Sequence, residues 1–446
     1  MKKSEVLLIA GMAYGDECKG SVVDHIARKH GAHTIVRYNG GPNAGHNVVT
    51  DDGRHHTFAQ FGSATFVPGV STFISRWMVI DPLAFVNEER HLREVRVHDA
   101  FDRLFIDEKA AVVTPYHRAA NKLREIHRSE GRHGSCGMGV GEAVLDYRTF
   151  GFECLLAGDL TDTDRIRRKL RFHRDEKRSQ LGPILADVSK HEAARSELQV
   201  FEDEAVLDEI AERFHSFAKK TTIVNETYLR GLLACEGTTI FEGAQGVLLD
   251  QEYGFYPYVT RSDVTFRNAG HLLTDFFGKV TRIGVLRGNA TRHGAGPFVT
   301  EDPEWTKRGL VGEHNGFGEW QQTFRVGHFD MVASRYALAA LGGVDEIALT
   351  CLDALPERPY VCIGYDGVEK DPSLFEFVGS RAVGIRTRFP LRTTEQERIT
   401  RALAKAKPHY IEVAGAQGLI DHIESESLPV TICSYGPAAK DKKERR

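Results

Sequence analysis

Two glycine-rich loops near the N-terminus carry the residues whose types and spacing best suit chemistry. The first reads Gly-Met-Ala-Tyr-Gly-Asp-Glu-Cys-Lys-Gly-Ser over residues 11–21. Its glycines let backbone N–H groups approach an anion, and a helix that begins after the loop adds a favourable dipole. The spacing differs from that of the P-loop. Acidic residues fit a phosphate loop when they meet Mg²⁺ or take a proton, and a structural turn explains the glycines equally well.

The second loop reads Asn-Gly-Gly-Pro-Asn-Ala-Gly-His-Asn over residues 39–47. Taken alone, it is equally well a glycine-shaped loop with a surface histidine. The carboxyl ends of neighbouring parallel strands meet at one edge of a sheet, where α/β proteins bind ligands. If both loops follow such strands, Asp16 and His46 can face one substrate as a base and an acid.

Short apolar runs that alternate with helical patterns predict the elements that position these loops. Residues 5–11 form an apolar run ended by glycine, which is typical of a buried strand in a parallel sheet. Residues 21–29 follow as a helix and residues 34–38 as a second strand, which closes a β-loop-α-β unit. Further strand signals lie at residues 72–74, 104–106, 239–242, 280–286, 346–352, 360–365 and 410–413. This alternation predicts an α/β sheet with right-handed crossovers.

Two segments differ from this alternation. Residues 161–218 are highly charged, nearly free of glycine and periodic like a helix. We expect them to form a helical insertion that packs on the sheet and turns its basic face to solvent. Residues 438–446 are charged, and we expect them to be a frayed C-terminal tail.

The composition limits the class of protein. The chain has 446 residues, with 58 Lys and Arg against 62 Asp and Glu, which gives a formal net charge of −4. A protein that wraps nucleic acid or binds anionic membranes would need an excess of positive charge, so these two classes are excluded. The length allows two or three average domains or one large α/β unit. With no long apolar run and no signal segment, we expect a cytoplasmic protein. The seven cysteines are scattered, without a CxxC pair or zinc spacing, and are expected to be reduced thiols.

Several stretches, in order along the chain, resemble the adenylosuccinate synthetase family. They are Tyr-Gly-Asp-Glu-Cys-Lys-Gly at residues 14–20, Asn-Gly-Gly-Pro-Asn-Ala-Gly-His at 39–46, Phe-Glu-Gly-Ala-Gln-Gly at 241–246 with Leu-Leu-Asp at 248–250, Tyr-Pro-Tyr-Val-Thr at 256–260, Thr-Arg at 291–292 with Gly-Ala-Gly-Pro-Phe at 294–298, Leu-Thr at 349–350 with Leu-Asp at 352–353, and Ser434 with Gly-Pro at 436–437. The resemblance implies one large α/β domain over residues 1–437, with a long, mostly parallel central sheet and helical insertions, related to P-loop proteins and usually a homodimer. It also implies a two-step ligase reaction. GTP phosphorylates the 6-oxygen of IMP, and the amine of L-aspartate then displaces that phosphate to form a C–N bond.

This chemistry accounts for the residue types in the two loops. A carbonyl oxygen is a poor leaving group until it is phosphorylated, so the site needs a base for N1–H, a donor near the oxygen and Mg²⁺ to neutralise the moving phosphoryl group. The resemblance implies that Asp16 is the base and a metal ligand, and that His46 assists phosphoryl transfer. It also implies that Lys19 holds phosphate charge and that the Gly45 carbonyl is the second protein ligand of Mg²⁺.

The resemblance also assigns binding residues. Contacts to the nucleoside monophosphate are expected from Asn43, Gln245, Thr260, Ser135, Cys136 and Arg148. Contacts to GTP are expected from Gly15, Glu17, Cys18, Lys19, Gly20, Gly45, His46, Asn47, Asp353, Ser434, Gly436 and Pro437. The expected partners are therefore small molecules, with no nucleic acid and no membrane.

The amino-acid loop departs most from the family. Where the family has Thr-Thr-Gly and a run of arginines, this chain has Glu319, Trp320, Gln321, Gln322, Thr323, Phe324 and Arg325. L-aspartate carries two carboxylates, which arginine forks bind bidentately. Gln322 and Phe324 cannot supply that charge, and Glu319 would repel it. The loop therefore indicates an altered amine pocket.

Three other positions also depart from the family. Residues 135–142 keep the glycines of a nucleotide loop but lose a threonine hydroxyl and an arginine, and Arg148 is the nearest candidate for the arginine that the family donates across its dimer. Cys351 replaces a lysine of the guanine motif, so GTP is favoured through Asp353 while ATP stays open. Cys18 replaces a glycine, and we expect its Cβ to require a negative φ. A small packed thiol is the simplest interpretation of Cys18 and is favoured over a redox or catalytic role.

Three functions are compatible with this pattern. The favoured hypothesis is a GTP-dependent ligase that keeps the phosphorylation and displacement chemistry but uses another amine, or another oxo-compound, in place of L-aspartate or IMP. Retained Asp16, Lys19 and His46 favour the chemistry, and the altered loop favours a changed nucleophile. One alternative is an ordinary adenylosuccinate synthetase of purine nucleotide biosynthesis. The other is a catalytically silent paralogue that binds nucleotide, which is disfavoured because a silent site has no need of the Asp16 and His46 pair.

Overall fold

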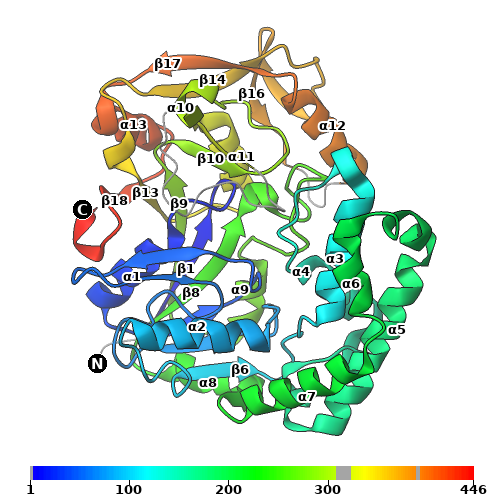
Figure 1. Cartoon of the computed structure of the whole chain (residues 1–446). Coiled ribbons are helices and arrows are strands. Elements are labelled where there is room, and N and C mark those ends of the chain that lie inside the picture. The colour runs from blue at the N-terminus through cyan, green and yellow to red at the C-terminus, as the bar shows by residue number, and fades with distance from the viewer. Residues whose placement is uncertain (1–3, 308–322, 388–391, 446) are drawn as a thin grey trace.

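A ten-stranded sheet forms the centre of the molecule. The computed structural model of the chain describes residues 4–307, 323–387 and 392–445. The strands run in the order β19-β18-β13-β9-β1-β8-β2-β5-β6-β7, and all neighbours pair in parallel except β18 with β19. Their bounds are β1 (Ser4–Gly11), β2 (Ala32–Arg37), β5 (Ser71–Ile74), β6 (Leu104–Asp107), β7 (Thr222–Val224), β8 (Gly237–Gly246), β9 (Lys279–Arg287), β13 (Glu346–Thr350), β18 (Val430–Ser434) and β19 (Lys442–Glu444). The predicted large α/β domain with a mostly parallel sheet is confirmed (Figure 1).

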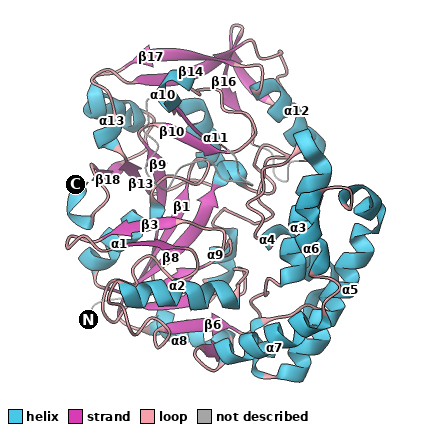
Figure 2. Ribbon diagram, viewed as in Figure 1, coloured by secondary structure: helices cyan, strands magenta, loops and turns pink. Residues whose placement is uncertain are grey.

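Apolar residues on both faces of β1 explain its central place in the sheet. Leu7 and Ile9 pack on one face with Val22 of α1 (Lys19–His30). Val6 and Leu8 belong to the cluster on the other face, which includes residues of α11 (Met331–Ala340) and α13 (Gly415–Ser425). Full burial of each such side chain contributes about 1.5–3 kcal/mol. Because helices cover both faces (Figure 2), β1 contributes to a site through the loop at its carboxyl end.

The second half of the chain forms a smaller, separate sheet. Its strands are β12 (Phe329–Asp330), β14 (Tyr360–Asp366), β15 (Phe375–Val378), β16 (Arg381–Ile385) and β17 (Lys407–Glu412), in the order β12-β14-β16-β15 with β17 also paired to β14. The strands that the sequence predicts at residues 360–365 and 410–413 therefore pair antiparallel with each other and do not extend the central sheet. Two short antiparallel ribbons complete the strands, β3 (His46–Val49) with β4 (His55–Phe58) and β10 (Ala290–His293) with β11 (Phe324–Gly327).

A group of helices covers one side of the molecule, coloured cyan to green in Figure 1. It contains α3 (Pro115–Arg128), α4 (Val140–Phe150), α5 (Thr163–Val188), α6 (Arg195–Gln199) and α7 (Glu204–Ala218). Residues 161–218 thus form most of this group, and Leu170, Leu181 and Phe214 bury their side chains within it. The other helices are α2 (Pro82–Glu94), α8 (Glu226–Ala234), α9 (Arg267–Leu272), α10 (Pro303–Lys307) and α12 (Thr393–Leu403). In the part of the chain that the structure describes, no helix combines the length and apolarity needed to cross a bilayer.

Residues 438–445 of the C-terminal segment are paired and packed, and for these residues the expectation of a frayed tail is wrong. Strand β19 pairs antiparallel with β18 at the edge of the central sheet. The side chain of Lys442 is 6% exposed, and Nζ donates to the carbonyl oxygens of Gly436, Pro437 and Ala438 at 3.1, 3.0 and 2.9 Å. The ladder hydrogen bonds and this set of carbonyls hold the charged segment in place. Lys442 thereby braces the turn that the sequence assigns to GTP.

Candidate active site

A buried ion pair shapes the first loop, which joins β1 to α1. The Glu17 carboxylate accepts hydrogen bonds from the backbone N–H groups of Ala13 and Gly15 at 2.9 and 2.8 Å. Lys19 Nζ donates to Glu17 Oε2 at 2.7 Å and to the carbonyl oxygen of Gly15 at 2.8 Å. Glu17 and Lys19 are each 1% exposed. Because removing either partner would leave a buried charge, the pair holds the loop in one shape with the Lys19 charge beneath it.

The Asp16 carboxylate contacts a histidine from a distant segment. Asp16 Oδ2 accepts a hydrogen bond from Nδ1 of His293, the last residue of β10, at 3.0 Å. The carbonyl oxygen of Asp16 accepts from Arg287 Nη1 at 3.2 Å. Burial lowers the pKa of His293, but the hydrogen bond and the negative charge of Asp16 outweigh burial and raise that pKa overall. The predicted base is therefore held both by its side chain and by its backbone.

His46, the first residue of β3, contacts a buried carboxylate. Nδ1 of His46 lies 2.5 Å from Glu242 Oε1. Glu242 also accepts hydrogen bonds from the backbone N–H of Ser63 at 2.9 Å and from the Ser63 hydroxyl. A Cβ on Gly20 would lie 2.7 Å from His46 Cβ, so this glycine lets the first turn of α1 pack directly on the histidine. The two glycine-rich loops therefore meet at the carboxyl edge of the sheet.

The surroundings of Glu242 favour its charged form. Burial opposes ionisation, but the positive charge of Arg37 and the hydrogen bonds from His46 and Ser63 lower the pKa of Glu242 to about 2. Burial lowers the pKa of His46 against the opposing effect of Glu242. His46 is therefore neutral at rest, with its proton on Nδ1 toward Glu242. The carboxylate can stabilise an imidazolium that forms during a reaction.

Two side-chain amides between the two loops have buried polar atoms without a described partner. Gln245 has a φ of 57°, and both its Oε1 and Nε2 are buried without a hydrogen-bond partner among the described residues. Oδ1 of Asn43 is likewise buried and unpartnered in that part of the chain. A Cβ on Gly40 would lie 3.3 Å from Gln245 Oε1, and one on Gly15 would lie 3.5 Å from Gln245 Cα. Buried polar atoms without partners are costly, so Gln245 and Asn43 point to a polar ligand.

The loop at residues 135–141 approaches Asn43 from the helical side. Ser135 Oγ exchanges hydrogen bonds with the side chain of Asn121 at 3.0 and 3.2 Å. Cys136 lies beside the Asn43 side chain, and burial raises the pKa of its thiol. Arg148 instead bonds to Gln251 Oε1 at 2.5 Å on the surface. The structure thus brings Cys136 to Asn43 and leaves Arg148 outside this group.

Three other predicted nucleotide contacts lie on the surface side of the second loop or in the segment after β8. Gly45 and Asn47 are exposed. The side chain of Asn47 accepts a hydrogen bond from the Thr57 hydroxyl at 2.5 Å, across the β3 and β4 ribbon. The backbone N–H of Thr260 donates to the carbonyl oxygen of Leu249 at 2.8 Å, which places Thr260 just after β8.

The predicted guanine motif lies against the first loop. The hydroxyl of Thr350 donates to the carbonyl oxygen of Glu17 at 3.0 Å. Asp353 is exposed in the following 3-10 turn, Leu352–Ala354. At the end of β18, the Ser434 hydroxyl donates to the carbonyl oxygen of Gly436 at 3.0 Å. The residues assigned to GTP outside the second loop therefore come from the ends of β1, β13 and β18, three strands of one sheet.

Cys18 does not have the backbone that we expect from its Cβ. Its φ is 62°, in the left-handed region, so the expectation of a negative φ is wrong. Cys18 is the residue before α1, and the left-handed turn there lets Lys19 fold back onto Glu17. The ion pair and the packing of α1 impose the conformation that a glycine would otherwise adopt freely. Cys351 has a φ of 55°, and its Sγ lies 3.6 Å from Cys18 Sγ.

Several residues of this site are absent from the sequence prediction. His293 lies between two stretches that match the family, at residues 291–292 and 294–298. Because the residue itself does not match, its position could have marked it as a candidate site residue. Glu242 lies within a matching stretch, but its role depends on its contact with His46. Lys442 lies in a segment whose charge favours a frayed tail, so no local signal identifies it.

The comparisons with known proteins agree with this arrangement. A family model described as adenylosuccinate synthetase matches residues 8–440. This chain belongs to the adenylosuccinate synthetase family. Members of this family are GTP-dependent ligases that use Mg²⁺.

Relatives of the family match along most of the chain. The adenylosuccinate synthetase of Chlorobium phaeobacteroides is 32% identical over 444 residues, which cover 96% of this chain and 95% of that protein. The Thermobifida fusca adenylosuccinate synthetase is 34% identical over 379 residues, 82% of each chain. Fully ligated adenylosuccinate synthetase from Plasmodium falciparum superposes with a TM-score of 0.76 at 20% identity, covering 99% of this chain and 100% of that one. Cyanophage S-2L succinoaminodeoxyadenylate synthetase, bound to dGMP and to dATP as an energy donor, gives 0.59 at 18% identity, with 99% and 96% covered. These two structures show that the fold is shared.

The family's Mg²⁺ suits the oxygens that the first two loops offer. A carboxylate at Asp16 and a backbone carbonyl at exposed Gly45 are hard oxygen donors, which Mg²⁺ prefers over nitrogen and sulfur. These two residues would hold the ion, which when bound neutralises charge on a transferring phosphoryl group.

The described part of the amine loop offers little free positive charge. Arg325 donates to Glu301 Oε2 at 2.8 Å and to the carbonyl oxygens of Gly294 and Gly296 at 2.6 and 3.0 Å. Phe324 is 4% exposed, and its ring centroid lies 4.7 Å from that of His293. Thr323 is exposed. Glu319, Gln321 and Gln322 lie outside the described residues.

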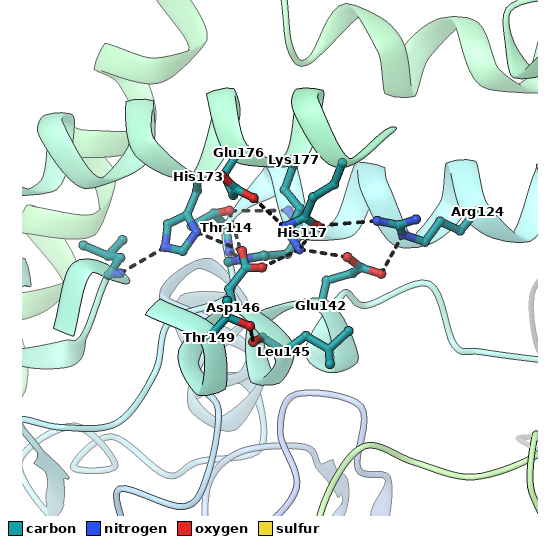
Figure 3. A network of polar contacts seen from close by, with 12 residues as sticks. Thr114, His117, Arg124, Glu142, Leu145, Asp146, Thr149, His173, Glu176 and Lys177 are labelled. Carbon is teal, nitrogen blue, oxygen red and sulfur yellow. Dashed lines mark hydrogen bonds and ion pairs between the residues drawn. The ribbon is translucent and has the colours of Figure 1, made fainter. Parts of the chain in front are cut away.

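A buried network ties α3, α4 and α5 together beside the loop at residues 135–141 (Figure 3). His117 Nδ1 accepts from the backbone N–H of Thr114 at 2.9 Å, and Nε2 donates to Asp146 Oδ2 at 3.1 Å. His173 Nε2 accepts from the backbone N–H of Leu155 at 3.0 Å, and Nδ1 donates to the same carboxylate oxygen at 3.3 Å. Each imidazole is thus a neutral tautomer with both nitrogens engaged.

Three groups of this network lie close enough to hold a metal ion, but their chemistry opposes one. The lone pairs of His117 and His173 accept from backbone N–H groups, so neither ring has a nitrogen left for a ligand bond. Lys177, whose side chain is fully buried, donates to Asp146 at 2.7 Å and to Glu142 at 2.9 Å and already supplies a cation. Burial and the neighbouring His173 lower the pKa of His117 to about 4. The network therefore positions α4 and the loop before it.

Proposed function

We propose that this chain is an adenylosuccinate synthetase that joins IMP and L-aspartate with the use of GTP. The observation that carries the proposal is the Gln245 amide, whose polar atoms are buried without a described partner between the loops of Asp16 and His46. A purine nucleotide offers the donors and acceptors that this amide needs. Relatives at 30–34% identity, which cover four-fifths or more of the chain, bear this name. They favour IMP and L-aspartate over the changed nucleophile that the amine loop indicates.

The side chains at the two loops can carry both steps of this reaction. Asp16 takes the N1 proton of IMP, and the charge left on O6 makes that oxygen a nucleophile for the γ-phosphorus of GTP. The O6–P bond forms as the bond to the leaving GDP breaks. His46 donates a hydrogen bond to the moving phosphoryl group through Nε2 once its ring has gained a second proton, and the Glu242 carboxylate behind it stabilises that imidazolium. The amine then attacks C6, phosphate leaves with O6, and the amine loses a proton.

The proposal extends to the nucleotide donor and the assembly. Exposed Asp353 suits hydrogen bonds from the N–H groups of guanine, which favours GTP over ATP. Arg148 is exposed on α4, and we propose that it serves a nucleotide site of the partner subunit in a homodimer. A cytoplasmic location fits substrates that belong to purine nucleotide metabolism.

A second function is favoured by the amine loop. Arg325 is paired with Glu301, and Phe324 is buried against His293. A pocket with this little free positive charge suits an amine that carries fewer carboxylates than L-aspartate. Such an enzyme would keep the same two steps with a different nucleophile.

Phosphate release from GTP tests the two functions. The protein is incubated with Mg²⁺, GTP and IMP, with and without L-aspartate, and with a panel of other amines and nucleoside monophosphates. We expect release that requires IMP and L-aspartate together, with a product of the mass of adenylosuccinate. Turnover with another amine but not with L-aspartate would replace the first function by the second. Release without any new nucleotide would contradict both.

A further inference from the structure

Two of the seven thiols lie in contact at the proposed GTP end of the site. Cys18 Sγ is 3.6 Å from Cys351 Sγ, although 333 positions separate the two in sequence. A disulfide bond is about 2.05 Å long, so the two sulfurs need to approach by about 1.5 Å to form one. Both residues are partly exposed, so the pair lies near the surface, where a small oxidant can approach it.

The backbone holds the two cysteines side by side. The hydrogen bond from Thr350 Oγ1 to the carbonyl oxygen of Glu17, at 3.0 Å, joins the residues that precede them. Both cysteines have left-handed backbones directly before a helical turn, with φ of 62° and 55°. This conformation is unfavourable for a residue with a Cβ. Strained positions of this kind gather at functional sites, and here each carries a thiol.

The other cysteines lie apart from this pair. Cys154, Cys362 and Cys433 are buried. Cys235 is exposed, and its Sγ lies 3.4 Å from the carbonyl oxygen of Gly231. All seven cysteines belong to the described residues, and among these no second pair of thiols is in hydrogen-bond contact. Cys235 therefore offers a matched control for the chemistry of an isolated thiol.

We propose that Cys18 and Cys351 are a redox modification site, in which a peroxide converts the two thiols to a reversible disulfide that closes the GTP end of the site. One sulfur attacks a peroxide oxygen, the O–O bond breaks and the thiol proton leaves with the departing oxygen as water, which yields a sulfenic acid. The second thiol displaces the sulfenic hydroxyl as another water and forms the S–S bond. Two thiols lose two electrons and two protons, and one hydrogen peroxide takes up both. A dithiol reverses the bond by exchange.

The position of the bond predicts its effect on nucleotide binding, and this step rests on the proposed function. Cys18 lies between Glu17 and Lys19 in the phosphate loop, and Asp353 follows Cys351 by two residues. The disulfide ties together two segments that GTP has to contact at the same time. Bound GTP and the disulfide therefore exclude each other.

Peptide mapping by mass spectrometry without reductant tests the bond itself. Full-length protein is treated with hydrogen peroxide, with and without GTP and Mg²⁺, and the peptide that contains Cys235 is followed as the isolated-thiol control. We expect a linked peptide pair containing Cys18 and Cys351, lighter than the two free peptides by two hydrogen atoms. It should form faster without nucleotide, and dithiothreitol should reverse it. Oxidation of other cysteines without this linked pair overturns the proposal.

Binding of a fluorescent GTP analogue tests the consequence. Oxidation should weaken binding about tenfold or more, which equals about 1.4 kcal/mol, and reduction should restore it. Cys351→Ser, with Cys18→Ser as a second variant, should keep the affinity of its own reduced form after the same treatment. Equal weakening in these variants would place the damage elsewhere and overturn the proposal. If the reduced protein turns over no IMP and L-aspartate, the proposed function fails, while the linked peptide still reports the bond.

Discussion

Replacing Asp16 by asparagine isolates the proton transfer on which the proposed reaction depends. The substitution keeps the side-chain shape and an oxygen that can accept the hydrogen bond from His293, but it removes the base. A positioned general base contributes about 10²–10⁴-fold to rate. We therefore expect Asp16→Asn to lower kcat by this factor, a rise of about 3–5 kcal/mol in the barrier, since each tenfold change equals about 1.4 kcal/mol.

The fold should tolerate this change. The side chains of Asp16 and His293 are 30% and 27% exposed, and partly exposed ion pairs contribute about 0–1 kcal/mol. The free energy of unfolding should therefore fall by less than about 1 kcal/mol. A loss of rate of the expected size cannot then be explained by loss of folded protein.

Phosphate release under saturating substrates measures kcat, and urea unfolding measures stability. Asp345→Asn is the matched control, because Asp345 forms a partly exposed ion pair with Arg282 at 2.9 Å, away from the two loops. This control should keep the rate of the unmodified protein. Near-normal kcat in Asp16→Asn would refute the assignment of Asp16 as the base.

Four other predictions test further parts of the account. Glu242→Gln should lower kcat about tenfold to hundredfold, because an amide cannot stabilise an imidazolium at His46. In the double variant with His46→Asn, the loss of kcat should be smaller than the product of the two single losses, and steady-state kinetics of that variant tests this. Lys442→Met should raise the KM for GTP about tenfold, more than it changes kcat, because three backbone carbonyls of the turn lose their hydrogen-bond donor. An unchanged KM would show that this turn does not contribute to GTP binding. Lowering the pH from about 6.5 to about 4 should reduce the free energy of unfolding by about 3 kcal/mol through His117, because the unfolded histidine binds a proton that the native one, with its pKa of about 4, does not. Urea unfolding should show a shallower pH slope in His117→Gln, and an equal slope would contradict the assignment. Added Zn²⁺ should leave the melting temperature unchanged, because the network around His117 has no free imidazole lone pair; a rise would show that it binds metal.

The meeting of the two loops is predictable from the sequence because it depends on local patterns. An apolar run that ends in glycine before a helix marks the carboxyl end of a parallel strand. Asp16 follows such a run, His46 lies in the loop after the second predicted strand at residues 34–38, and Gly20 packs on His46 in the structure. The family motifs add the identity of the reaction, which no spacing argument could supply.

The remaining contacts depend on pairings between distant segments. His293 meets Asp16 across 277 positions, and Glu242 meets His46 across 196. Sheet membership is also set over long distances, so the strand signals at residues 360–365 and 410–413 do not reveal that they build a separate sheet. The left-handed backbone of Cys18 escapes prediction because the Glu17 and Lys19 ion pair, and not the side chain of Cys18, determines it.

The fate of the 6-oxygen of IMP tests the central claim most directly. IMP labelled with ¹⁸O at position 6 is converted with GTP, Mg²⁺ and L-aspartate, and the released phosphate is analysed by mass spectrometry. If O6 attacks the γ-phosphorus and then leaves with it, the label appears in inorganic phosphate, one atom for each C–N bond formed. Unlabelled phosphate, with the label kept in the nucleotide or released to water, would contradict the proposed chemistry.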